Sequence, residues 1–169
     1  MDNKVCLVIG AGDATGGAIA RRFAREGYHT CMTRRTRHLD ELEKLAERIR
    51  DDGGSATAFG SDAREEEEVI ALVNKIEKDI GPIEVAVFNI GANVNFSITE
   101  TTTRVYRKVW EMGCFAGFLL GREAARVMIP RERGTILFTG ATASVRGSSG
   151  FSAFAGAKHG LRALAQSMA

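Results

Sequence analysis

Short apolar runs alternate with amphipathic stretches along this chain. Five short runs lack a regular alternation of apolar and polar positions, which is typical of strands buried on both faces of a sheet. They are VCLVIG (5–10), YHTCMT (28–33), ATAFG (56–60), IEVAVFN (83–89) and TILFTG (135–140). Between them, apolar residues recur at the spacing of a helix. This periodicity predicts helices at 16–25, 39–49, 69–76, 102–128 and from 151 to the end.

The strict alternation of strands and helices predicts an α/β fold with a parallel sheet. Right-handed crossovers make it a doubly wound, Rossmann-type domain, with residues 1–169 as a single unit and the strand order 3-2-1-4-5. In that order TILF (135–138) becomes an apolar edge strand, although such edges are normally covered. The sequence therefore looks like the first two-thirds of a larger domain, either a fragment or a natural short form.

The composition and net charge of the chain exclude some classes of binding partner. The 169 residues carry a net charge of +2 with acids and bases interspersed, so neither nucleic acid nor a membrane surface is an expected partner. The start, MDNKVCLVIG, is neither a signal peptide nor long enough to span a bilayer. Cys6, Cys31 and Cys114 have no metal-ligand spacing, so no metal is expected. We interpret them as reduced, buried residues of a cytoplasmic protein.

A glycine-rich loop, GAGDATGG (10–17), joins the first predicted strand to the first predicted helix. A dinucleotide pyrophosphate needs such a loop, because the backbone must come close to it at the N-terminus of a helix. A plain structural turn also uses glycines, but the place after the first strand favours dinucleotide binding. The candidate ligands in this loop are Gly10, Gly12, Asp13, Thr15 and Gly16.

Two arginines follow the second predicted strand, where such folds distinguish NAD from NADP. An NAD site has an acid there for the ribose hydroxyl, and an NADP site has a cation for the 2′-phosphate. The segment TRRTRH (33–38) has Arg34 and Arg35, and no acid before Asp40. Cations at a helix start oppose the helix dipole, so an anionic ligand would account for them better than solvation alone. We expect NADP rather than NAD as the cofactor.

Together these residues resemble the short-chain dehydrogenase/reductase family over essentially the whole chain. Gly10 and Gly16 match the family's glycine motif, in which Ala14 replaces the middle glycine. The segments GSDA (60–63) and FNIG (88–91) resemble its adenine-binding aspartate and its asparagine-rich turn. The resemblance implies three further cofactor-binding residues: Asp62, Asn89 and Gly91.

The family's catalytic residues are mostly replaced. The resemblance places its asparagine on Gly113, its serine on Ala141 and its tyrosine on Phe154 of FAGAK (154–158). Only the lysine is kept, as Lys158, which the family uses to hold the ribose at the nicotinamide end of the cofactor. Phenylalanine has no proton to give, so the usual alcohol–ketone chemistry should be impaired.

Other hydroxyls lie near these positions. Thr139, Thr142 and Ser144 occupy the same loop as Ala141, where they could replace the lost donors or simply cap the turn. Two functions stay open: an NADP-dependent oxidoreductase with an altered proton path and a small-molecule substrate, or a non-catalytic dinucleotide-binding protein acting as a sensor or inactive oligomer partner. The apolar segments CFAGFLLG and GLRALAQSMA, whose family counterparts pair between subunits, predict a homo-oligomer.

Overall fold

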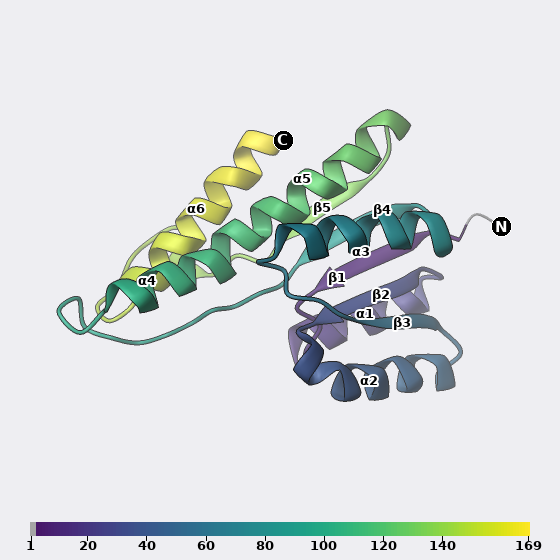
Figure 1. Ribbon diagram of the computed structural model, residues 1–169, viewed down its shortest axis with the longest axis horizontal. Coiled ribbons are helices and arrows are strands. Elements are labelled where there is room, and N and C mark those ends of the chain that lie inside the picture. Colours follow the sequence, from purple (N-terminus) through teal and green to yellow (C-terminus); the bar gives the residue numbers. More distant parts are fainter. Residues whose placement is uncertain (1–2) are drawn as a thin grey trace.

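Five strands form a parallel sheet in the order β3-β2-β1-β4-β5 in the computed structural model, which describes residues 3–169 (Figure 1). Each predicted apolar run becomes one strand. The strands are β1 (Val5–Ile9), β2 (His29–Arg34), β3 (Ser55–Gly60), β4 (Ile83–Phe88) and β5 (Thr135–Phe138). The predicted fold class and strand order are thus confirmed.

Helices cover both faces of the sheet. They are α1 (Thr15–Arg25), α2 (Leu39–Asp51), α3 (Glu66–Asp79), α4 (Thr103–Trp110), α5 (Ala116–Met128) and α6 (Ser152–Met168). The stretch predicted as one helix over 102–128 has the right extent, but a π-helical turn, Glu111–Phe115, separates α4 from α5. Short 3₁₀ turns at Thr36–His38, Ile129–Arg131 and Thr142–Ser144 lie in segments where the periodicity predicted no element.

The alternation of side chains along β1 builds two hydrophobic cores. Leu7 and Ile9 pack in one core with residues of α3, α5 and α6, whereas Cys6 and Val8 pack in the other with residues of α1 and α2. All four side chains are fully or almost fully buried, as expected for the central strand of a parallel sheet. Within residues 3–169, no helix combines the length and apolarity that crossing a membrane requires.

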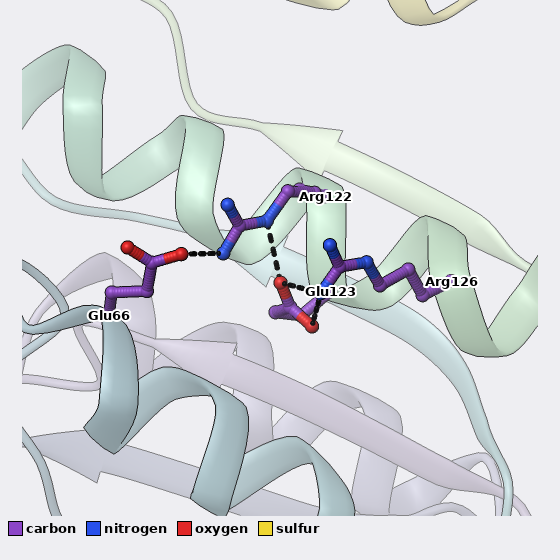
Figure 2. Close-up of polar contacts among 4 residues, drawn as sticks. All are labelled: Glu66, Arg122, Glu123 and Arg126. Atoms are coloured by element: carbon purple, nitrogen blue, oxygen red, sulfur yellow. Dashed lines mark hydrogen bonds and ion pairs between the residues drawn. The ribbon is translucent and has the colours of Figure 1, made fainter.

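A network of four charged side chains links α5 to the start of α3 (Figure 2). The Arg122 guanidinium donates from Nη2 to Glu66 Oε1 and from Nε to Glu123 Oε1, each at 2.6 Å. Arg126 Nη1 donates to both oxygens of Glu123 at 3.0 Å. The Glu123 side chain is only 7% exposed, so these two arginines satisfy a carboxylate that could not stay buried unpaired.

The strand β5 forms one edge of the sheet and pairs only with β4 in the described chain. Its Leu137 side chain is 43% exposed, in agreement with the predicted apolar edge. The three cysteines are free and buried, and burial raises the pKa of Cys6 and Cys31 to about 12. Both thiols therefore stay protonated near neutral pH.

Candidate active site

The glycine loop is held tightly at the carboxyl end of β1. The amides of Gly10 and Ala11 both donate to the Thr33 carbonyl at 3.1 Å, and Gly10 has a φ of +88° that favours glycine. A Cβ atom at Gly16 would lie 2.2 Å from the Gly10 carbonyl oxygen, which no side chain could tolerate. A Cβ atom at Gly12 would meet nothing within 4 Å, so this side of the loop is open.

One pocket, here called the arginine pocket, lies at the carboxyl ends of β1, β2 and β3. It is lined by Ile9, Gly10, Thr33, Arg34, Arg35, His38, Ser61, Asp62, Ala63, Arg64, Ile90 and Met112. Three arginines and a histidine face a single aspartate here, so the pocket suits an anionic ligand.

The two arginines after β2 are in different situations. Arg34 Nη1 donates to Glu41 Oε2 at 2.7 Å, so its charge is already paired. Arg35 makes no ion pair within residues 3–169, and it contributes to the charge field that favours ionised Asp62. Arg35 is therefore the cation best placed to bind a further anion.

Asp62 is held by its near neighbour Arg64. Arg64 donates to Asp62 Oδ1 from its backbone amide at 3.1 Å and from Nε at 2.9 Å. The side-chain hydrogen bond from Arg64 lowers the pKa of Asp62, so the aspartate is ionised near neutral pH. Ser61, just before it, is 7% exposed, and its hydroxyl has no hydrogen-bond partner in the described chain.

A second pocket, here called the lysine pocket, lies between the glycine loop and the start of α6. It is lined by Gly10, Gly12, Ala14, Thr15, Gly16, Asn89, Ile90, Gly91, Thr139, Gly140, Ala141, Phe154 and Lys158. Gly10 and Ile90 line both pockets, so the two form adjoining parts of one surface. The glycine loop and FAGAK, which are far apart in the sequence, meet here.

Asn89, which follows β4, forms hydrogen bonds with residues at the ends of β1 and β5 around the lysine pocket. Its backbone amide donates to the Ile9 carbonyl at 2.8 Å, and its side-chain Nδ2 donates to the Gly10 carbonyl at 3.2 Å. The Thr139 hydroxyl donates to Asn89 Oδ1 at 3.0 Å. This one side chain therefore links the ends of β1, β4 and β5.

Lys158 is the charged group of the lysine pocket. It is 2% exposed, and its Nζ donates to the carbonyl oxygens of Ile90 at 3.0 Å and Thr139 at 2.8 Å. Burial lowers the pKa of Lys158 below its usual range. The ammonium is thus fixed in place by two backbone acceptors, with no carboxylate beside it in the described chain.

The positions that replace the family's serine and tyrosine both line this pocket, as Ala141 and Phe154. Neither side chain can donate a hydrogen bond. Of the three hydroxyls considered as substitutes, Thr139 is engaged with Asn89, and Ser144 Oγ accepts from the Ala141 amide at 3.0 Å. Thr142 is exposed in the following 3₁₀ turn.

Two of the predicted site residues lie outside both pockets. The exposed Asp13 carboxylate points to Arg48, 3.8 Å away, instead of lining a pocket. Gly113 lies within the π-helical turn, and a Cβ atom there would be 3.1 Å from that of Ala157, so it serves the packing of α6. In contrast, Ser61, His38 and Arg64 line the arginine pocket, although no motif in the sequence indicates them. Ser61 and Arg64 flank Asp62, and His38 ends the TRRTRH run.

The residues present fit a dinucleotide. The glycine loop leaves open space at Gly12, and the N-terminus of α1 follows it. The pocket at one end offers Arg35 and the Ser61 hydroxyl, neither of which has a side-chain partner among residues 3–169, and the pocket at the other end holds the Lys158 ammonium. Together with the sheet order, these features define a Rossmann-type dinucleotide-binding protein.

Comparison with known proteins makes the class specific. A family profile described as short chain dehydrogenase matches residues 4–169. A 3-oxoacyl-(acyl-carrier-protein) reductase from Bos taurus is 30% identical over 171 residues, which cover 99% of this chain and 70% of the reductase. The chain belongs to the short-chain dehydrogenase/reductase family.

Solved structures agree with this assignment. A short-chain dehydrogenase from Rhodopseudomonas palustris superposes with a TM-score of 0.94 at 54% identity, over 99% of this chain and 78% of the other. A metagenomic short-chain oxidoreductase in complex with NADP superposes with a TM-score of 0.91 at 25% identity, over 98% of this chain and 75% of the other.

Proposed function

We propose that this chain is an NADP-dependent oxidoreductase whose active site works without the tyrosine of its family. The observation that carries the NADP preference is Arg35, a cation without an ion-pair partner in the described chain, at the end of β2 in the arginine pocket. The complex of a related metagenomic enzyme with NADP supports the same cofactor. A cation at this point favours a 2′-phosphate over a free ribose hydroxyl.

The residues of the two pockets would bind different parts of the dinucleotide. The glycine loop and the N-terminus of α1 would hold the pyrophosphate, Arg35 would hold the 2′-phosphate, and Lys158 would hold the ribose beside the nicotinamide. When bound, the reduced dinucleotide supplies a hydride. Phe154 and Ala141 flank the place where a small carbonyl substrate would react, and neither donates a hydrogen bond to its oxygen.

The test begins with the wild-type chain. Titration by fluorescence or calorimetry should give a Kd for NADPH at least about tenfold lower than that for NADH, since a charge-assisted contact contributes about 1.5–3 kcal/mol. A panel of reactive ketones should then oxidise bound NADPH. Failure to bind either dinucleotide would contradict the proposal.

The alternative function is a non-catalytic dinucleotide-binding protein. It is favoured by one observation: neither Phe154 nor Ala141, which line the lysine pocket, has a proton to give. Tight NADPH binding with no hydride transfer to any ketone of the panel would select this alternative. The same titration and assay therefore separate the two functions.

We further propose that the chain forms a homo-oligomer through the helical stretch of α4 and α5 together with α6, which contain the apolar segments CFAGFLLG and GLRALAQSMA. Exposed Trp110 and Phe118 stack on the ring of Phe115 between them, with centroid distances of 5.8 Å and 6.0 Å. Large stacked aromatic side chains are typical of the buried centre of an interface. Phe115 and Phe118 belong to CFAGFLLG, one of the two apolar segments whose counterparts pair between subunits in the family.

Trp110→Glu is expected to shift the protein from dimer or tetramer towards monomer, because a charge would be buried at the centre of the interface. Sedimentation velocity over a range of concentrations measures this. Ile129→Glu is the matched control, since Ile129 is 72% exposed at the far end of α5. A monomeric wild-type chain at high concentration would refute the proposal.

A further inference from the structure

The lysine pocket has one titratable side chain. Of its thirteen lining residues, only Lys158 can gain or lose a proton near neutral pH, because the others are glycines, apolar residues, an asparagine and two threonines. Threonine hydroxyls do not titrate in this range, and that of Thr139 is already donated to Asn89. Any proton that this pocket supplies directly must therefore come from Lys158 or from water.

Lys158 has a hydrogen available for transfer. An ammonium group carries three N–H donors, and two of them are used by the carbonyl oxygens of Ile90 and Thr139. Both of these residues line the lysine pocket, so their carbonyls hold Nζ at its wall. The third hydrogen has no acceptor in the described chain.

Phe154 lies one helical turn before Lys158, on the same face of α6. The family resemblance assigns the acid, a tyrosine, to this position. The phenylalanine ring has no hydroxyl, so the group that would have supported the acid becomes the nearest acid itself. Both side chains line the same pocket.

We propose that Lys158 is the general acid of this site and protonates the carbonyl oxygen of a small ketone or aldehyde directly. This inference rests on the proposed oxidoreductase function, in which reduced nicotinamide dinucleotide is the hydride donor. The carbonyl carbon gains the hydride and its oxygen gains the Lys158 proton, so the C=O π bond is replaced by a C–H and an O–H bond. Lysine is left as a neutral amine and regains its proton from water.

The surroundings of Lys158 favour proton release. Burial lowers its pKa, and no charged side chain of the described chain opposes that effect. His159, the next residue on α6, has its Nδ1 2.9 Å from the Ala155 carbonyl oxygen. On the elements packed against α6, Tyr106 and Cys114 lie beside Gly156 and Gly160, and neither lines the lysine pocket. Reduction needs the protonated lysine, so its rate should fall as pH rises through the pKa of Lys158.

The first test needs no turnover. A side-chain NMR titration of the full chain with isotopically labelled lysines, assigned with Lys158→Met, should give Lys158 the lowest pKa among the lysines. Exposed Lys75, which pairs with Asp79, provides the internal reference. A pKa for Lys158 equal to or above that of Lys75 would overturn the inference whether or not the chain is active.

The second test compares Lys158→Arg with wild type. Arginine keeps the positive charge but does not give up its proton, so kcat for ketone reduction, measured at saturating NADPH, should fall by about 10²–10⁴-fold. The Kd for NADPH is measured separately, because the same change also alters the contact of Lys158 with the ribose. The decline of the rate at high pH should disappear from what activity remains. Lys75→Arg, the same change at an exposed site, should match wild type.

The outcomes separate this inference from the proposed function. Ketone reduction that Lys158→Arg leaves unchanged, with the same pH profile, would refute Lys158 as the acid and leave the oxidoreductase function standing. Wild-type protein that binds NADPH without reducing any ketone would refute both. Loss of NADPH binding in Lys158→Arg, with wild-type rates at saturating cofactor, would make Lys158 a binding residue only.

Discussion

Replacing Gly16 with alanine is expected to destroy both the glycine loop and the dinucleotide site. The new Cβ atom would lie 2.2 Å from the Gly10 carbonyl oxygen and 2.7 Å from Ala11 Cα. Both are backbone atoms of the same loop, so the strain cannot be relieved by a side-chain rotation. We expect a loss of about 1–3 kcal/mol in the free energy of unfolding, the usual cost of overpacking.

Dinucleotide affinity in Gly16→Ala should fall by more than about 100-fold, or about 2.7 kcal/mol. Gly12→Ala is the matched control, because its Cβ atom meets nothing within 4 Å. It should change stability by less than about 0.5 kcal/mol. It should still weaken dinucleotide binding, since its methyl group enters the lysine pocket. Denaturant unfolding and fluorescence titration measure the two effects, and equal stability losses in both variants would contradict this account of the loop.

Replacing Arg35 with alanine is expected to remove the preference for NADPH. The lost contact is a charge-assisted one worth about 1.5–3 kcal/mol, so the Kd for NADPH should rise by about 10- to 100-fold. The Kd for NADH should stay the same, because NADH has no 2′-phosphate. Calorimetric titration of both cofactors into wild type and Arg35→Ala measures the difference.

The control for this experiment is Arg37→Ala. Arg37 belongs to the same basic run but is exposed, and it lines neither the arginine pocket nor the lysine pocket. Within residues 3–169, its only side-chain contact with a lining residue is the hydrogen bond from Arg37 Nε to His38 Nε2 at 3.0 Å, so the variant mainly reports the general effect of net charge. If Arg37→Ala weakened NADPH binding as much as Arg35→Ala, the 2′-phosphate assignment would fail.

The strands and most helices could be predicted because their apolar patterns are long and regular. The π-helical turn could not. This turn adds one residue within an otherwise helical stretch. Its only trace in the sequence is the five-residue spacing between Trp110 and Phe115, whose rings stack in the structure. Single apolar residues at such spacing are too common to mark a turn of this kind.

The site residues that could be predicted from the sequence are those at or near the ends of strands, because the sheet determines their positions. Gly10, Asp62 and Asn89 each directly follow or lie near the end of a parallel strand, so the fold brings them to one edge of the sheet. Asp13 was not predictable in the same way, because a loop side chain can point to either side. Whether Arg34 or Arg35 carries a free charge depends on Glu41, seven residues after Arg34, whose contact appears only in three dimensions.

The position of β1 at the centre of the sheet has a consequence for how the chain is made. β1 pairs with β2 on one side and with β4, about 80 residues further along the chain, on the other. At about 5–20 residues per second on a ribosome, one edge of β1 waits roughly 4–16 s for its partner strand. An apolar strand left open for that time attracts chaperones or other nascent chains. The open edge of β1 during synthesis therefore adds a second site of aggregation to the apolar edge at β5, which stays unpaired on one side in the described chain.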